Sequence, residues 1–333
     1  MKKSTVIFLA MVMIISVVST EAGAQKNKES VKLPAISEEI MSMRDADQKM
    51  RIKWSTLYKK QKSETPKFKE LTQKLIASDR ANTARMREIV QEHGWPTYDL
   101  VGRRASNGAW LIVQHSDRNP LFQAKCLPLL KAAVDNGQAD PSNYAYLYDR
   151  VQVSQAKKQL YATQSRSNNG LMEGTFYAIN DESNVQNRRE EMGIDYHVEE
   201  YAKSMGFEYQ VPSAEEAKKR SEKIVAEYEK NVAEAQQAMK AKDYKAAADK
   251  YLLVTIADGA VTTDDLVLAS KALSLSNHEQ MKEATSFLTK AMARGWDGLD
   301  EIKTHSDFEN LRNSNSPSWQ DFIITAEQMA LDR

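Results

Sequence analysis

The sequence has little of the residues that cross-link a chain or interrupt its helices. Its 333 residues include a single cysteine, 12 glycines and 8 prolines. One cysteine excludes an internal disulfide. Few glycines and prolines, with plentiful Ala, Lys, Glu, Gln and Met, favour helices. We therefore expect a mainly α fold, with one small β-hairpin or flap described below.

The chain also lacks an excess of charge of either sign, with 46 basic and 46 acidic residues. Proteins that bind nucleic acid usually carry a basic excess on one face, so the composition predicts no nucleic-acid partner. After the first 25 residues, no apolar stretch reaches the length of about 20 residues that a membrane span needs. We expect no membrane span in the mature chain.

The N-terminus has the three parts of a secretory signal. Two lysines precede an uncharged segment, Ser4 to Thr20, and the small residues Ala22 and Ala24 stand before Gln25. We expect cleavage after Ala24 and a periplasmic or secreted protein; a retained membrane anchor is the alternative. The only cysteine, Cys126, is far from this signal, so a lipoprotein is not expected.

The rest of the chain has a length typical of two domains. With residues 1–24 as the signal peptide, we predict a flexible leader over 25–36, a helical domain over 37–209 and a second helical domain over 210–333. Ser213 and Glu216 have the spacing of a capping box, which marks the start of the second domain.

Local signals predict several elements of the first domain. A long helix from about Pro66 to His93 should end at Gly94. Residues 160–179 alternate in polarity and contain "NNG", which is typical of a β-hairpin or irregular flap. Two short helices should end near Gly193 and Gly206.

Two segments of the second domain, "KDYKAAADKYLLV" and "NHEQMKEATSFLTKAMARGW", can be aligned with each other. Ala247, Tyr251 and Val254 in the first correspond to Ala284, Leu288 and Ala291 in the second. The segments resemble tetratricopeptide repeats, and "SDFENLRNSNSPSWQDFI" resembles the closing segment that follows such repeats. The resemblance implies packed helical pairs with an extended surface for a protein or peptide partner.

Five ordered motifs in the first domain resemble a bacterial family known only as a domain of unknown function. They are "RDADQKMR", "DRANTARMREIVQEHGWP", "AWLIVQHSDRNPLFQ", "YAYLYDRV" and "QLYATQ". The resemblance covers about residues 40–207 and implies a mostly α fold but no activity. In one departure, Ala162 stands where glycine is expected in "YGTQ", so this turn is expected to be less tight.

The stretch "QHSDRNPLFQ" places polar side chains where one apolar helix ends and the next begins. His115 and Asp117 lie in the predicted loop, and Gln123 on the following helix can reach back toward them. The other polar residues of the family's motifs are expected to edge a pocket floored by His115, and Arg44 could reach it from its own helix. These further residues are Arg44, Asp149, Arg150, Gln159, Tyr161 and Gln164.

Three interpretations of this polar cluster stay open. The side chains could satisfy backbone groups at helix ends and do nothing more. They could bind a small-molecule ligand, through Arg44, Gln123, Arg150, Tyr161 and Gln164. They could be catalytic, with His115 as general acid or base and Asp117 or Asp149 as its orienting partner.

Other kinds of chemistry have weaker signals. The histidines show no spacing typical of a metal site, so we expect no metal ligands and no cofactor. No "GxSxG" motif is present, and Cys126 in "KCLPLL" is expected to be a small core residue. We predict an exported cell-envelope protein that binds a ligand or serves as a scaffold; the alternative is a hydrolase or lyase with its site around His115.

Overall fold

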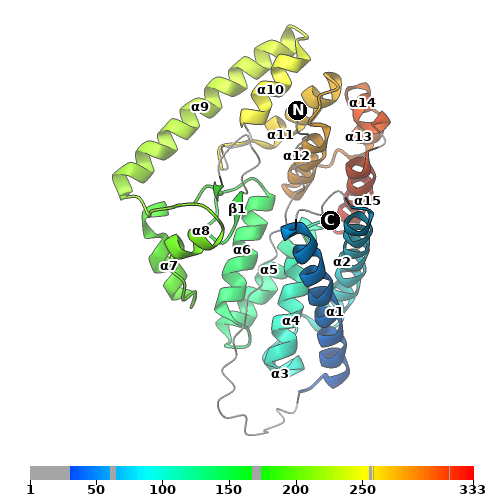
Figure 1. The fold of residues 1–333 in the computed structure, drawn as a ribbon, viewed down its shortest axis with the longest axis vertical. Helices are drawn as coiled ribbons and strands as arrows, with labels where there is room; N and C mark the ends of the chain where they lie inside the picture. The colour runs from blue at the N-terminus through cyan, green and yellow to red at the C-terminus, as the bar shows by residue number, and fades with distance from the viewer. Residues whose placement is uncertain (1–30, 61–64, 167–173, 255–256, 258, 315) are drawn as a thin grey trace. The chain divides into compact units, whose positions relative to one another are not determined.

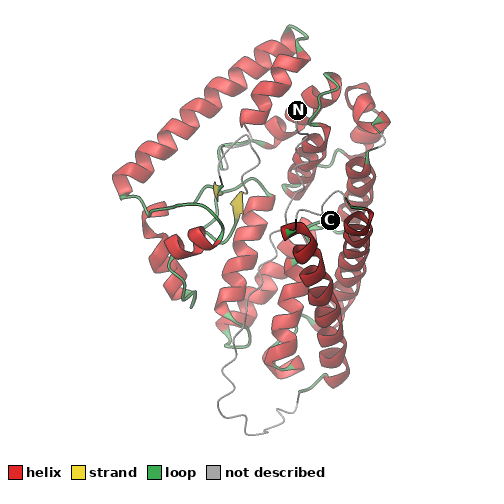
Figure 2. Cartoon of the chain, viewed as in Figure 1, coloured by secondary structure: helices red, strands yellow, loops and turns green. Residues whose placement is uncertain are grey.

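The computed structural model describes residues 31–60, 65–166, 174–254, 257, 259–314 and 316–333. Within these ranges the fold is mainly helical with one two-stranded sheet, which confirms the predicted fold class (Figures 1 and 2). The predicted signal peptide lies outside the described residues. None of the described helices is both long and apolar enough to cross a membrane.

The chain divides into two compact units. Unit 1 contains residues 1–118 and 122–144, and unit 2 contains residues 119–121 and 145–333. The boundary expected from the sequence, at residue 210, falls inside unit 2. That boundary stays a prediction about which part of the chain folds alone.

Unit 1 is built from helices joined by short loops. They are α1 (Pro34–Lys59), α2 (Pro66–His93), α3 (Tyr98–Val101), α4 (Arg103–Gln114), α5 (Pro120–Asp135) from Phe122 onward, and the first turn of α6 (Pro141–Ser154). The predicted limits of α2 are confirmed. The Thr65 side chain accepts a hydrogen bond from the Phe68 N–H at its start, and Gly94 follows its end with φ of 73°.

Close packing between α1, α2 and α4 fixes the position of the polar cluster in unit 1. At Gly108 in α4, an added Cβ atom would lie 3.2 Å from Cγ2 of Ile40 in α1. The two helices approach closely because glycine has no side chain at this point. Near the other end of α1, Trp54 packs against Phe68 and Leu75 of α2.

Unit 2 contains the small sheet and a group of short helices. Strands β1 (Ser165–Arg166) and β2 (Thr175–Phe176) are antiparallel, with Ser165 opposite Phe176. This confirms the small hairpin, although "NNG" lies outside the described residues. After η1 (Glu182–Asn184) come α7 (Val185–Glu191) and α8 (Val198–Ser204). Gly193 and Gly206 follow these two helices with positive φ.

Longer helices make up the rest of unit 2. They are α9 (Ala214–Lys240), α10 (Tyr244–Val254), α11 (Thr263–Leu275), α12 (Met281–Ala293), α13 (Leu299–Thr304), η2 (Ser306–Phe308), α14 (Glu309–Asn313) and α15 (Pro317–Leu331). The capping box of Ser213 and Glu216 is present at the start of α9. Successive helices pack in the pairs α9 with α10, α10 with α11, and α11 with α12.

The residues aligned between the two repeat-like segments all belong to the core of unit 2. Ala247, Tyr251 and Val254 of α10 and Ala284, Leu288 and Ala291 of α12 are completely buried. Small residues at such positions allow neighbouring helices to approach closely. Membership of the tetratricopeptide repeat family stays a prediction.

Candidate functional site

The cluster in unit 1 begins at the end of α4. This helix buries Ala109, Ile112 and Val113, and His115 follows it as the C-cap residue. The His115 N–H donates to the Leu111 carbonyl oxygen, which continues the helical pattern by one residue. The His115 side chain therefore starts from a well-ordered backbone, and it is 13% exposed.

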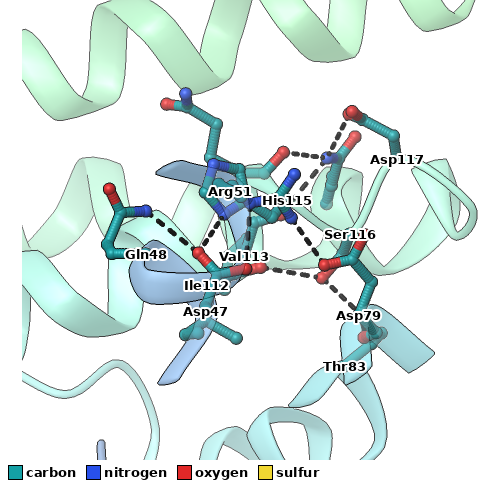
Figure 3. A network of polar contacts seen from close by, with 12 residues as sticks. Asp47, Gln48, Arg51, Asp79, Thr83, Ile112, Val113, His115, Ser116 and Asp117 are labelled. Atoms are coloured by element: carbon teal, nitrogen blue, oxygen red, sulfur yellow. Dashed lines mark hydrogen bonds and ion pairs between the residues drawn. The ribbon is translucent and has the colours of Figure 1, made fainter. Parts of the chain in front are cut away.

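A buried carboxylate holds one ring nitrogen of His115. Nδ1 of His115 lies 2.9 Å from Oδ2 of Asp47, whose side chain is completely buried in α1 (Figure 3). The Gln48 side chain donates to the same carboxylate oxygen at 3.0 Å. Because Asp47 has few ways to move, it fixes the orientation of the imidazole ring.

An arginine connects this carboxylate to a second one. Nε of Arg51, one helical turn after Asp47, donates to Oδ1 of Asp47 at 2.9 Å. The Nη2 atom of Arg51 donates to Oδ1 of Asp79 in α2 at 2.5 Å. Beside Asp79, Oγ1 of Thr83 lies 2.8 Å from Oγ of Ser116. Figure 3 shows how this polar network joins α1, α2 and the end of α4.

The two aspartates of the network have opposite pKa shifts. Burial raises the pKa of Asp47, but hydrogen bonding to His115 and the charges of His115 and Arg51 outweigh it, so the pKa is lowered. Burial raises the pKa of Asp79 to about 7; the charge of Arg51 opposes this rise and that of Asp47 adds to it. Asp79 therefore gains or loses its proton near neutral pH.

Gln123 reaches back from α5 to the end of α4 and to Asp117. Its Nε2 atom donates to the carbonyl oxygens of Val113 and Gln114 at 3.2 and 3.0 Å, and to Oδ1 of Asp117 at 3.2 Å. These bonds satisfy carbonyl groups that have no partner inside the helix. Within the described residues, the Oε1 atoms of Gln114 and Gln123 are buried and accept no hydrogen bond. Such acceptors cost about 1 to 3 kcal/mol each.

A second polar cluster, in unit 2, is centred on Asp149 of α6. Its buried carboxylate accepts hydrogen bonds from the backbone N–H groups of Leu160, Tyr161 and Thr163, and from the Thr163 hydroxyl. Burial raises the pKa of Asp149 to about 6, although these hydrogen bonds lower it. The carboxylate thus holds the backbone of the 160–163 turn.

The neighbours of Asp149 also bond to backbone atoms. The Gln159 and Gln164 residues are paired twice: the Gln164 N–H donates to Oε1 of Gln159, and Nε2 of Gln159 donates to the Gln164 carbonyl, each at 2.9 Å. The buried Arg189 donates to the Tyr161 carbonyl at 2.8 Å. These hydrogen bonds hold the backbone between Gln159 and Gln164 in place.

Both polar clusters lie in a part of the chain that matches a known protein family. Residues 34–212 match the model of a family described as "Family of unknown function (DUF6624)". The chain belongs to this family. The predicted N-terminal domain of unknown function is thereby confirmed. The DUF6624 region includes both polar clusters and ends next to Ser213, the first residue of the capping box of α9. Comparison with the curated proteins and with the solved structures gives no match.

Within the DUF6624 region, the residues expected to form one pocket fall into different compact units. His115, Asp117, Gln123 and Arg44 belong to unit 1. Arg44 pairs with Asp45 at 3.5 Å. The residues in unit 2 are Asp149, Arg150, Tyr161 and Gln164. A single pocket that includes both groups stays a prediction.

Sequence reasoning did not single out Asp47, Arg51 or Asp79. The carboxylate bonded to Nδ1 of His115 is Asp47, whereas Asp117 and Asp149 were the expected orienting partners. Asp47 and Arg51 stand four residues apart in "RDADQKMR", a spacing that places them on one helical face. In a chain with 28% charged residues, such pairs are common, and most lie in solvent.

The remaining candidate side chains have simple surroundings. Cys126 is completely buried in α5, which confirms that it is a core residue. His197 is exposed before α8. The described part of the chain holds no group of three or more histidine, cysteine or acidic side chains placed to share a metal ion.

Proposed function

We propose that this protein binds a small polar ligand at a site centred on His115 in the DUF6624 region. One observation carries the proposal: a largely buried histidine whose Nδ1 atom lies 2.9 Å from a completely buried carboxylate. A ring fixed at one nitrogen directs its other nitrogen in a single direction, as ligand recognition and proton transfer both require.

The way in which Asp47 is held supports a role beyond stability. Asp47, Arg51 and Asp79 are all nearly or completely buried. Removing charges from water costs several kcal/mol per ion, so a buried ion pair is an inefficient means of stabilising a fold. A network of this kind fits better with the need to keep His115 in one orientation.

A second candidate function, a hydrolase or lyase, is favoured by the same hydrogen bond. His115 would act as general base or acid, and Asp47 would set its tautomer and stabilise the imidazolium form. The nearby Asp79, with a pKa raised to about 7, would adjust the charge around this pair as the pH changes.

A ligand screen with matched variants tests the proposal. Wild type, His115→Ala and the exposed control His197→Ala would be compared by thermal shift against amino acids, dipeptides, sugars and nucleotides. Chromogenic esters and phosphates would be assayed in parallel. We expect at least one compound to raise the melting temperature of the wild type and of His197→Ala but not that of His115→Ala.

The opposite result would assign the cluster a structural role. His115→Ala would then lose about 1 to 3 kcal/mol of stability, because Asp47 keeps a buried oxygen without its partner. Any compound that binds the wild type would bind this variant with unchanged affinity. His197→Ala should stay within about 0.5 kcal/mol of the wild type in either case.

We also propose that the protein works in the cell envelope and uses its C-terminal helices to bind a protein or peptide. The signal-like N-terminus supports export, and the buried small residues of α10 and α12 support a repeat-like surface. Mass spectrometry of the protein from periplasm or culture medium should find Gln25 at the N-terminus. Recovery of the intact Met1 end from membranes would refute export.

Partner binding has its own test. A tagged segment of residues 213–333 and the complementary segment 25–212 would each be used to capture proteins from an envelope extract. The proposal expects a specific partner with 213–333. Capture by 25–212 alone would contradict it.

A further inference from the structure

Unit 2 contains a cavity of about 730 Å³ that the proposed site at His115 does not use. Its volume lies in the range of about 300 to 1,000 Å³ that is usual for small-molecule sites. One side is formed by residues 175–179, which include β2, and by η1. The other side is formed by the first half of α9.

One face of α9 lines this cavity. Ala217, Ser221, Ile224 and Tyr228 follow each other at intervals of three or four residues, which places them in one row along the helix. Each is partly buried, and Ala235 is the only completely buried residue among the 27 of α9. The first half of the helix thus turns its less polar face toward the cavity, and the charged Lys218, Arg220 and Glu229 border this face.

Aromatic rings give the cavity an apolar lining. Phe176, Tyr177, Tyr209 and Tyr228 lie around it. The hydroxyl of Tyr209 donates to Oε1 of Glu182 at 2.9 Å, and that of Tyr228 donates to Oδ2 of Asp265 at 2.6 Å. Because both hydroxyl groups have carboxylate acceptors, the rings can contact an apolar molecule without leaving a polar atom unpaired.

Two carboxylates of the cavity lining form ion pairs, whereas Lys158 is bonded to a neutral side chain. Glu182 accepts hydrogen bonds from Arg220 at 2.8 Å and from Tyr209, and Asp181 pairs with Arg188 at 3.1 Å. The Nζ atom of Lys158 donates to the neutral Ser221 hydroxyl at 3.2 Å. In the part of the chain that the structure describes, no carboxylate forms an ion pair with Lys158.

We propose that this cavity binds an organic carboxylate with an apolar body. The carboxylate group would accept hydrogen bonds from Nζ of Lys158, and the apolar body would lie against the aromatic rings and the Ile224 side chain. The ammonium group has three donors and uses one on Ser221, which leaves donors for both oxygens of one carboxylate. Glu182 and Asp181 are already paired with arginines, so they repel the anion little. Glu229, the third carboxylate of the lining, is exposed, and solvent screens its charge.

Calorimetric titration of the full-length chain with octanoate and with octanol tests the role of charge. The two probes share a similar chain and differ in the carboxylate. Lys158→Met should weaken octanoate binding about tenfold, because it removes a charge-assisted hydrogen bond but keeps most of the side-chain length. Octanol affinity should stay unchanged. Equal octanoate affinity in the wild type and in Lys158→Met would overturn the proposal.

Two further variants control for general charge and for location. Lys223→Met removes one positive charge from α9, but the exposed Lys223 side chain is no part of the lining, so octanoate affinity should not change. Ala217→Phe places a ring in the cavity, and it should abolish binding of both probes. If Ala217→Phe binds octanoate as the wild type does, the ligand lies elsewhere and the proposal is wrong. Circular dichroism melting would establish that each variant is folded.

Discussion

Arg51 faces two buried aspartates, and a single positive charge cannot neutralise both. Asp47 also has His115 as a partner, which keeps its pKa low. Asp79 has less compensation, and burial raises its pKa to about 7. At neutral pH the proton therefore resides partly on Asp79, and the Asp47 carboxylate stays ionised beside the histidine.

Because the pKa of Asp79 is raised, we predict that this residue makes the free energy of unfolding depend on pH. Its pKa is higher in the folded chain than in the unfolded chain, so its contribution is fully present below about pH 4 and is lost as pH rises toward 7. Between pH 5 and 8 the wild type should lose about 2 kcal/mol from this group. Asp79→Asn, which resembles the protonated acid, should lack this loss in urea titrations at the two pH values.

Asp45→Asn provides the control, because Asp45 lies on α1 with an exposed side chain. Its stability should follow the pH dependence of the wild type. If Asp79→Asn also follows the wild type between pH 5 and 8, Asp79 is ionised throughout this range, and Arg51 compensates it fully.

Ala162 gives a second prediction for a single residue. Its φ of 50° lies in the left-handed region, which explains why the family resemblance led us to expect glycine there. The residue is also completely buried. Ala162→Val should cost about 2 to 3 kcal/mol, since a β-branched side chain is strained in this conformation. Ala162→Gly should change the free energy of unfolding by less than about 1 kcal/mol, as measured by urea denaturation.

A loss of less than 1 kcal/mol in Ala162→Val would show that the 160–163 turn can relax. In that case the four hydrogen bonds to Asp149 would not hold the turn rigidly, and the described geometry would not limit which residue fits at position 162.

The sequence predicted the candidate site only where the signal was local. Gln123 was expected to reach back toward His115 and Asp117 because it follows a visible helix start at Pro120, and the structure shows its bond to Asp117. Asp47 lies 68 residues from His115. Their contact depends on how α1 packs against α4, which no spacing within either helix specifies. In the sequence, the charged pairs of α1 cannot be told apart. Only the packing of α1 against other helices determines which pairs are buried and which are exposed.

At the scale of secondary structure, the same distinction explains which helix limits could be predicted. Thr65 and Gly94 act on α2, and Ser213 acts on α9, through hydrogen bonds or dihedral angles that involve residues no more than four positions away. The short strands β1 and β2 were expected only as a hairpin or flap. The strands pair Ser165 with Phe176, and a separate bridge joins Gln159 to Ile179, so the sheet is specified by contacts between residues that are distant in the sequence.

Packing between α1 and α4 connects the fold to the candidate site. Because a Cβ atom at Gly108 would lie 3.2 Å from Ile40, Gly108→Leu should push the two helices apart and cost about 2 to 3 kcal/mol. The same displacement should lengthen the bond between Asp47 and His115. Nuclear magnetic resonance of labelled histidine should show a changed His115 tautomer and changed His115 ring shifts, and an unchanged His197 signal.

A variant that is destabilised but keeps the wild-type His115 signal would contradict this coupling. It would mean that the network holds α1 and α4 together at the His115 end by itself. Gly137→Ala provides a comparison, since Gly137 has positive φ but open space around it, so it loses stability without moving either helix.

At the scale of the whole molecule, the compact units of the structure and the domains predicted from the sequence have different boundaries. The long segment of compact unit 2 begins at Ala145, whereas the sequence predicts a boundary at residue 210, and the family match ends at residue 212. Contacts cross residue 210 within unit 2. The completely or nearly buried core that includes Tyr251 and Leu288 also includes Ala156. The Gly259 N–H donates to the Ala156 carbonyl at 2.8 Å.

The final prediction is that residues 210–333 fold without the rest of unit 2. Nearly all of the core around Tyr251 and Leu288 lies in this segment, and Ala156 contributes one small side chain to it. The segment would lose that methyl group, the Gly259–Ala156 hydrogen bond, the Arg220–Glu182 ion pair and the Lys158–Ser221 hydrogen bond. These losses should together cost about 2 to 4 kcal/mol, which a core of this size can tolerate. Urea unfolding of 210–333, followed by circular dichroism, should be cooperative, and this segment should be less stable than 145–333. If only 145–333 unfolds cooperatively, the contacts around Ala156 are essential, and the chain divides near residue 145 instead of residue 210.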